Sequence, residues 1–255
     1  MSWPEALAIL LAGVGAGTIN TVVGSGTLIT FPTLLAFGVP PVTANVSNTV
    51  GLVPGSVSGA IGYRAELAGQ RDRLLRLGSA SLLGGTAGAV LLLVLPSTAF
   101  DTIVPVLIGL GVLLVVTGPM ISRRVAARAE RRGVEVADHG SWWVWPAVAA
   151  AGIYGGYFGA AQGVLLMAVL GIGVADSLQR HNATKNVLAG LVNAVAAVIF
   201  ILVAEVDWLV AGLIAAGSIV GGQLGATVGR RLPPMVLRGV IVVVGVTALV
   251  VFLAD

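Results

Sequence analysis

The stretch from Gly24 to Ser56 reads GSGTLITFPTLLAFGVPPVTANVSNTVGLVPGS, and it decides the fold. A glycine break at Gly24-Ser25-Gly26 precedes a short apolar run, which ends at Phe37-Gly38. A second apolar run follows and carries polar residues from Asn45 onward. A glycine break beside a hydrophobic segment too short to span a bilayer, with polar side chains in the next segment, is typical of polar sites inside membrane proteins. The stretch therefore predicts a membrane protein with a buried polar site.

The same order of features returns in the second half of the chain. Ala161-Gln162-Gly163 forms the second break, a short apolar run ends at Gly171-Ile172-Gly173, and polar residues follow from Asn182. The following pairs are each 137 positions apart: Gly26 and Gly163, Asn45 and Asn182, Gly84-Gly85 and Gly221-Gly222, Gly88 and Gly225, and Leu95-Pro96 and Leu232-Pro233. This constant offset predicts two copies of one unit, residues 5–121 and 142–255, joined by a charge-rich cytoplasmic connector at 122–141. The glycine pairs at 84–88 and 221–225 are expected to be packing contacts between helices.

The composition places the chain in a bilayer. Hydrophobic residues make up 57% of it and charged residues 10%, and the mean hydropathy is +1.01. A water-soluble domain needs more polar surface than this, so we predict an all-α integral membrane protein. The absence of cysteine excludes a disulfide framework and thiol chemistry. The arginines fall in short tracts between apolar runs, so nucleic acid is not an expected partner.

The lengths of the apolar runs predict which of them cross the membrane. Most contain 19 to 23 residues, which is enough for a hydrocarbon core of about 30 Å. The runs that begin at Gly26 and Gly163 are too short and predict half-helices or re-entrant segments. Whether each copy has five crossings, or fewer with a re-entrant hairpin, stays open at this point. The expected runs are Pro4–Val23, Gly26–Gly38, Val42–Tyr63, Leu74–Leu95, Thr102–Ile121, Trp143–Ala161, Gly163–Gly173, Asn182–Ala204, Trp208–Val228 and Val236–Leu253.

The arginine tracts predict that the two copies are inverted in the membrane. Basic loops stay on the cytoplasmic side, which places the tracts 64–76, 123–132 and 230–238 there. The loops at the equivalent positions, near Asp101 and Glu205, carry no arginine. Because the charge bias flips between equivalent loops, the copies should face opposite ways, as in secondary transporters. Both termini are then expected outside the cell membrane.

Polar residues at matching positions predict the binding site. On the long run of the second copy they share one helix face: Asn182, Lys185, Asn186 and Asn193. The first copy carries polar residues at the same four positions: Asn45, Asn48, Thr49 and Ser56. We expect the two stripes to face each other and to form a small polar chamber. The expected substrate-binding residues are Ser25, Gly26, Thr27, Asn45, Asn48, Thr49, Gln162, Gly163, Asn182, Lys185, Asn186 and Asn193.

Lys185 is the only lysine in the chain, and it indicates an anionic ligand. A charge at this depth costs about 2.5 to 3.5 kcal/mol on insertion scales unless an anion or water offsets it. Helix starts after the two breaks would add positive dipole ends, with Ser25, Thr27 and Gln162 as hydrogen-bond donors. One alternative is that Lys185 snorkels to the interface. Another is that the asparagines only hold helices together.

Charged residues also flank the second break, at Asp176, Arg180 and His181. We expect a solvated loop there, with gating or a titrating histidine as the alternative.

Several motifs resemble those of the sulfite exporter TauE/SafE family, also called the toluene sulfonate uptake permeases. They are Leu28 to Leu35 followed by Gly38, Ala44 to Asn48, and Gly84-Gly85-Thr86-Ala87-Gly88, repeated in the second half. The resemblance covers nearly the whole chain, but the second copy has Val169 in place of Pro32 and Lys185 in place of Asn48. It implies transport of sulfite, sulfonates or related small oxyanions across the cell membrane, commonly outward.

We therefore predict a secondary transporter that exports a small oxyanion by alternating access. An uptake permease for an organosulfonate or another small anion is the alternative, and a membrane scaffold or assembly factor is a second class. An enzyme is not expected, because two histidines, no cysteine and loop carboxylates leave no convergent catalytic groups. No cofactor or metal is expected. The expected partners are a small anionic substrate and the lipid bilayer, and a homo-oligomer is left open.

Overall fold

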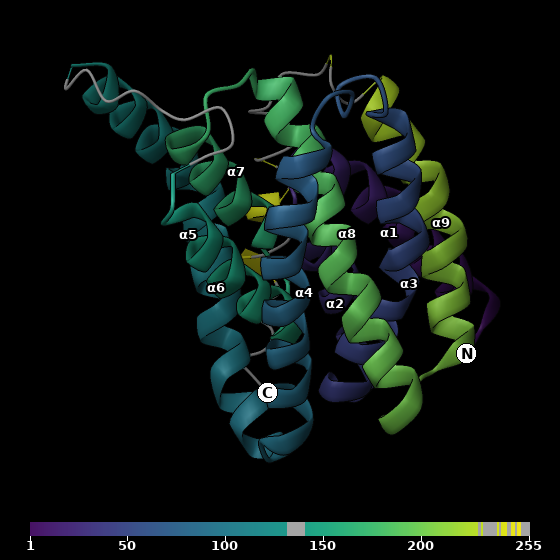
Figure 1. Ribbon diagram of the computed structural model, residues 1–255. Coiled ribbons are helices and arrows are strands. Elements are labelled where there is room, and N and C mark those ends of the chain that lie inside the picture. Colours follow the sequence, from purple (N-terminus) through teal and green to yellow (C-terminus); the bar gives the residue numbers. More distant parts are fainter. Residues whose placement is uncertain are drawn as a thin grey trace.

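The structure is a computed structural model that describes residues 1–131 and 141–228, together with the isolated positions 231, 239, 241–243, 246, 247, 249 and 250. The described residues form helices joined by short connections, without a strand among them (Figure 1). This confirms the predicted all-α class. The helices are α1 (Trp3–Val22), α2 (Thr27–Ala36), α3 (Pro41–Gly62), α4 (Arg71–Val94), α5 (Ser97–Arg131), α6 (Val144–Tyr157), α7 (Gln162–Gly173), α8 (Leu178–Val203) and α9 (Trp208–Thr227).

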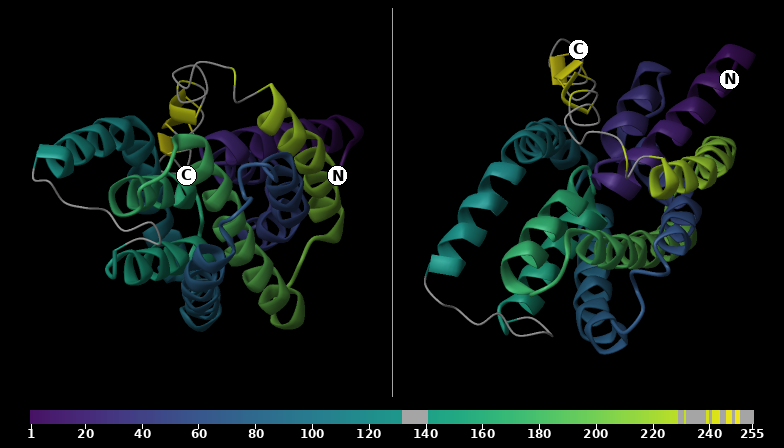
Figure 2. Two further views of the ribbon diagram at one scale, coloured as in Figure 1. Left: turned by 45° about the horizontal axis from the view of Figure 1, so that its top comes forward. Right: turned by 90° about the horizontal axis from the view of Figure 1, so that it is seen from above.

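Five of the described helices are long and apolar enough to cross a membrane. They are α1, α4, the segment Thr98–Gly118 of α5, α8 and α9. Helix α3 has 22 residues but carries buried polar side chains, and it packs between α8 and α9. Viewed from above, α5 and α9 lie on opposite sides of the bundle with α8 between them (Figure 2). The chain is therefore a multi-pass membrane protein.

The short helices are arms of hairpins that turn back inside the protein. The amide of Ser141 donates a 3.0 Å hydrogen bond to the carbonyl of Gly173, so the end of α7 returns to the start of α6. Helix α2 likewise turns back along α1, because a methyl group on Gly26 would lie 2.5 Å from the Ala16 carbonyl oxygen. Helices α2 and α7 have 10 and 12 residues, which is too short to cross a bilayer.

Two helix boundaries differ from the sequence-based expectation. Helix α6 ends at Tyr157, four residues before the expected Ala161, because Gly159 adopts a φ of +77° that a helix does not tolerate. Helix α5 continues to Arg131 through the first half of the expected connector, whose alanine, arginine and glutamate residues are strong helix formers. The rest of the connector, 132–140, lies outside the described residues, as does most of the expected run Val236–Leu253.

Two contacts between long helices each join a helix of the first half to a helix of the second half. Helix α1 packs against α9, and α4 packs against α6. At the 137-residue offset, α6 is the counterpart of α1 and α9 is the counterpart of α4. The contact of α4 with α6 is therefore the counterpart of the contact of α1 with α9. Glycines permit the close approach, as predicted: a methyl group on Gly84 would lie 2.2 Å from the Ala149 carbonyl oxygen, and one on Gly221 would lie 2.1 Å from that of Val14. The inverted orientation of the copies stays a prediction.

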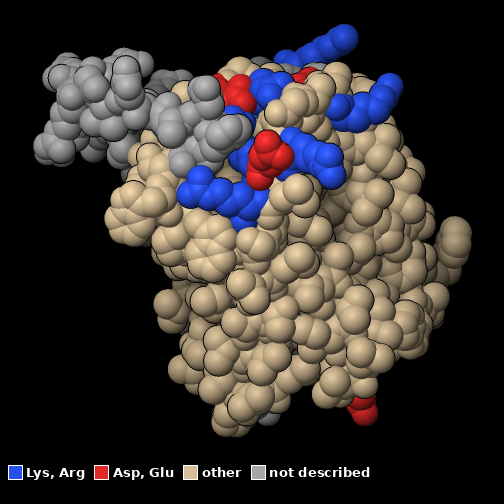
Figure 3. All heavy atoms as spheres, viewed as in Figure 1, with Lys and Arg blue, Asp and Glu red and all other residues tan. Residues whose placement is uncertain are grey.

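Basic side chains gather at one end of the molecule on the face shown in Figure 3, and none is visible there at the other end. The connection between α3 and α4, the start of α4 and the start of α8 contribute them. The N-terminal end of the chain lies toward the opposite end (Figure 1). The end that carries the basic side chains is called the arginine-rich end below.

Candidate functional site

The two glycine breaks touch each other inside the protein. The amide of Gly163 donates to the carbonyl of Gly24 at 3.0 Å. A methyl group on Gly24 would lie 2.3 Å from the Cα atom of Gly163, and Gly24 has a φ of +90°. Only glycine therefore permits this approach. The contact also brings together the neighbouring residues Ser25 and Gln162, whose side chains are 0% and 3% exposed.

Three side chains of α8 bind the carbonyl groups at the end of α1. The ammonium of Lys185 donates to the carbonyls of Asn20 and Thr21 at 2.8 and 2.9 Å. The amides of Asn182 and Asn186 each donate to the Thr21 carbonyl at 3.2 Å. The last carbonyls of an α-helix lack an intrahelical partner and carry the negative end of its dipole. The polar stripe of the second half therefore caps the first helix of the other half.

An equivalent contact occurs at the second break. The amide of Asn45, the counterpart of Asn182, donates to the carbonyl of Tyr157 at the end of α6, at 3.0 Å. Next to it, Asn48 donates to the hydroxyl of Thr27 at 3.2 Å and accepts a hydrogen bond from Thr30. Each half thus contributes a buried asparagine to the helix end that precedes the break of the other half. These asparagines therefore link helices in this structure, and their role in binding a ligand stays a prediction.

The other three residues of the predicted stripes, Thr49, Ser56 and Asn193, bond elsewhere. The hydroxyl of Thr49 donates to the carbonyl of Asn45 in its own helix at 2.9 Å. Asn193 lies 3.5 Å from the hydroxyl of Ser56, further along α3 and α8. The structure therefore joins most of the predicted set at the breaks, but the hydrogen bonds of Thr49 and Asn193 lie outside that group.

Lys185 points into the protein, so the snorkelling alternative is wrong. Its exposed fraction is 0%, and it forms no ion pair with any residue that the structure describes. A lysine ammonium has three N–H donors, and the carbonyls of Asn20 and Thr21 account for two of them. The side chain can therefore offer its charge and one further donor to a ligand.

Unpartnered polar atoms surround the two breaks. Within the described part of the chain, five buried atoms there lack a hydrogen-bond partner: Oγ of Ser25, Oδ1 of Asn45, the hydroxyl of Tyr157, Nε2 of Gln162 and Oδ1 of Asn182. Leaving a buried polar atom unsatisfied costs about 1 to 3 kcal/mol. The hydroxyls of Ser25 and Tyr157 and Nε2 of Gln162 can donate to oxygen atoms of a small polar ligand, whereas the two Oδ1 atoms can only accept. The place where the breaks meet is therefore the candidate binding site.

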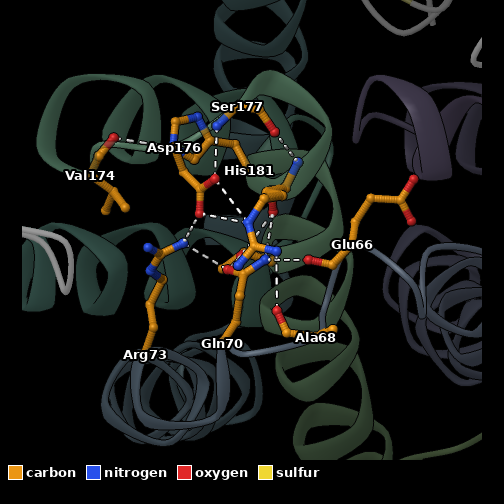
Figure 4. Close-up of polar contacts among 10 residues, drawn as sticks. Glu66, Ala68, Gln70, Arg73, Val174, Asp176, Ser177 and His181 are labelled. Atoms are coloured by element: carbon orange, nitrogen blue, oxygen red, sulfur yellow. Dashed lines mark hydrogen bonds and ion pairs between the residues drawn. The ribbon is translucent and has the colours of Figure 1, made fainter.

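A second polar cluster closes the arginine-rich end of the protein (Figure 4). The carboxylate of Asp176, between α7 and α8, forms ion pairs with Arg73 at 2.6 Å and Arg180 at 2.9 Å. Burial alone would raise the pKa of Asp176, but hydrogen bonds from both arginines and from the Ser177 amide outweigh it and lower the pKa to about 2. The loop is exposed at Ala175 and Ser177, as expected, but its carboxylate is paired with arginines at the starts of α4 and α8.

Gln70 links this cluster to α8. Its side-chain oxygen accepts hydrogen bonds from Arg73 and from the hydroxyl of Thr184, both at 2.7 Å. At the opposite end, the amide of Asp207 donates to the hydroxyl of Ser47 at 2.9 Å. Ser47 and Asp207 are the counterparts of Thr184 and Gln70 at the 137-residue offset. Equivalent positions are therefore in contact at each end, but the hydroxyl donates to a side chain at one end and accepts from a backbone amide at the other. Among the described residues, ion pairs are added at the arginine-rich end.

Sequence reasoning missed these end contacts. Gln70 and Asp207 each lie directly before a helix, in connections that the hydropathy pattern treats as ordinary loops. Adding 137 to the number of every polar residue would have shown that Gln70 and Asp207 occupy equivalent positions. Which residue each one contacts follows only from the fold.

Comparison with known proteins identifies the family of the chain. The model of the family described as sulfite exporter TauE/SafE matches residues 9–252. The chain is 26% identical over 233 residues to the probable membrane transporter protein YfcA of Escherichia coli strain K12, covering 90% of this chain and 82% of that protein.

Two further relatives show similar coverage. A probable membrane transporter protein of Haemophilus influenzae is 24% identical over 94% of this chain and 91% of its own length. The probable membrane transporter protein ORF9 of Sinorhizobium sp is 25% identical over 97% and 92%. No solved structure matches the chain. Because the family match spans nearly the whole sequence, the resemblance drawn from its motifs is confirmed, and the protein belongs to the TauE/SafE family of membrane transporters.

Proposed function

We propose that the protein moves a small oxyanion, with sulfite or a sulfonate as the leading substrate, out of the cell across the cell membrane by alternating access. The observation that carries the proposal is the meeting of the two breaks. A buried lysine without an ionic partner among the described residues binds the end of α1 just before the first break, and buried polar atoms that lack hydrogen bonds belong to residues at both breaks. A buried cation with spare donors is stabilised most by a ligand that brings negative charge and several acceptor oxygens.

The roles of the site residues follow from their positions. Lys185 supplies the charge and its remaining N–H, while Asn182 and Asn186 hold the end of α1 in place beside it. Ser25 and Gln162 supply donors next to the two breaks, at which Gly26 and Gly163 allow the backbone to come close. An anion held there replaces its lost hydration shell with these donors.

Alternating access requires that the ends open in turn. In this proposal the arginine-rich end is cytoplasmic and both termini are outside, in keeping with the preference of basic loops for the cytoplasm. The contact of Gln70 with Thr184 holds the cytoplasmic end closed, and the contact of Asp207 with Ser47 holds the outer end closed. Rocking of two inverted units around the breaks would break one contact at a time.

Flux of labelled sulfite, a taurine-like sulfonate and thiosulfate in proteoliposomes tests the proposal. Lys185→Met and Asn182→Ala should lower the initial rate, by about tenfold or more for Lys185→Met, because a charge-assisted hydrogen bond is lost. Thr102→Ala, at an exposed position on α5, is the matched control and should transport as the wild type does. Unchanged flux in both site variants would remove the site from the mechanism.

The same assay separates the alternatives. Loading the substrate inside or outside the vesicles distinguishes an exporter from an uptake permease, provided that the orientation of the protein is determined. A scaffold or assembly factor would show no flux of any of the three anions.

A further inference from the structure

A groove with a volume of about 400 Å³ lies between α3 and α8, and Asn186 of the candidate site is one of the residues that line it. Small residues create it: a methyl group on Gly190 would lie 3.3 Å from Cβ of Ser56, so the two helices come close at one point and separate beyond it. The walls are mainly apolar, formed by Val53, Val57, Ile61, Leu67, Val187 and Leu191.

The groove opens toward the surroundings of the protein. Val57 and Ile61 are 54% and 53% exposed, although both are large hydrophobic residues on a membrane-embedded helix. Exposed apolar side chains at this level face the acyl chains of the bilayer. The groove is therefore accessible to a hydrocarbon chain from the lipid.

Arg64 lies at the arginine-rich end of the groove. It is exposed, and its guanidinium makes only a 3.4 Å hydrogen bond to the carbonyl of Ile61. Arg73 and Arg180, in contrast, share the carboxylate of Asp176. Among the described residues Arg64 has no ionic partner, so its charge is available to a ligand at the mouth of the groove.

We propose that this groove binds an anionic phospholipid, with one acyl chain between α3 and α8 and the phosphate on Arg64. Basic residues at the cytoplasmic ends of grooves between membrane helices suit anionic head groups, and each buried methylene group of the chain adds hydrophobic stabilisation. The apolar walls and the exposed Arg64 at one end match the two parts of such a lipid. This inference is independent of the transported substrate.

The test measures the thermal stability of the detergent-purified protein with phosphatidylglycerol or phosphatidylcholine added, and counts bound lipid by native mass spectrometry. The thermal stability of the wild type should rise more with phosphatidylglycerol than with phosphatidylcholine. Arg64→Gln should bind it about fivefold more weakly, as expected for the loss of one basic residue near a lipid surface. Gly190→Leu should bind neither lipid in the groove, because the new side chain fills it.

Arg71→Gln is the matched control, because Arg71 is exposed at the same end but does not line the groove. It should respond to lipid as the wild type does. Arg64→Gln changes an exposed side chain and carries the test even where Gly190→Leu does not fold. Equal responses of Arg64→Gln and Arg71→Gln, or equal binding of both lipids by the wild type, would overturn the proposal. A dimer that Gly190→Leu dissociates would assign the groove to a second copy, and displacement of lipid by sulfite or a sulfonate would assign it to the substrate.

Discussion

Asn193 and Ser56 occupy equivalent positions in the two halves, 137 residues apart, and their side chains meet at 3.5 Å. A contact between counterparts is expected where a twofold axis relates two copies. Helices α3 and α8 pack against each other at this pair. We infer that the crossing of these helices marks the centre about which the halves are arranged.

Replacement of either glycine at the meeting of the breaks should destabilise the protein. Gly163→Ala places a methyl group 2.3 Å from the Cα atom of Gly24, and Gly24→Ala adds the strain of a φ of +90°. Each should lose about 1 to 3 kcal/mol or more, measurable as a lower midpoint of thermal unfolding in detergent. Gly171→Ala, in α7 with open space around it, is the control and should leave the midpoint unchanged. Equal midpoints for all three variants would contradict the close contact.

The stability of the folded protein should depend on pH because of Asp176. Its pKa in the folded protein is about 2, below the ordinary value of 3.8, so its ion pairs stabilise the fold fully above about pH 4. That contribution is lost as the pH falls through about 2, where the folded state binds a proton as the unfolded state does. The difference in unfolding temperature between wild type and Asp176→Asn should therefore be present at pH 7 and shrink toward pH 2. A difference that stays constant with pH would show that the ion pairs do not cause it.

The end contacts should control access to the breaks. The chain has no cysteine, so Ser25→Cys provides a single buried label at the site. A membrane-impermeant thiol reagent added at the arginine-rich side should react several times faster when Asp176→Asn is also present, since the ion pairs no longer hold that end. Ser47→Ala should speed the reaction from the opposite side only. If both variants act equally from both sides, the contacts do not gate the site.

The inverted orientation of the halves can be tested by labelling. Single cysteines at Asp101, near the start of α5, and at Arg231, after α9, should be modified from opposite sides of the membrane. Asp101→Cys should react from outside and Arg231→Cys from the cytoplasm. Labelling of both from one side would refute the inverted repeat and, with it, the assignment of the two end contacts.

The sequence predicted the helices well where hydropathy and glycine agree. The breaks at Gly26 and Gly163, the short helices after them and the glycine contacts between long helices all follow from residue spacing. The end of α6 was missed because Phe158, Ala160 and Ala161 are as apolar as the helix before them. Hydropathy reports burial and does not report a backbone turn, so the positive φ of Gly159 leaves no signal in it.

The sequence indicated which residues belong to the candidate site, but not which groups they contact. The matched stripe identified Asn45, Asn182 and Lys185, and all three contact a helix end that precedes a break. Their partners are backbone carbonyls of the other half, and every residue type has a carbonyl. Sequence patterns therefore give no means of choosing Asn20 or Thr21, which only the packing of α8 against α1 selects.

The hydrogen bond between Gly24 and Gly163 also bears on how the protein is made. The ribosome releases residue 24 long before residue 163, so immediate insertion would bring the carbonyl of Gly24 into the lipid without its partner. An exposed backbone carbonyl inside hydrocarbon is unfavourable by several kcal/mol. The first hairpin is thus expected to wait near the translocon or at the membrane surface, and to settle to its final depth only after the second hairpin has been synthesised.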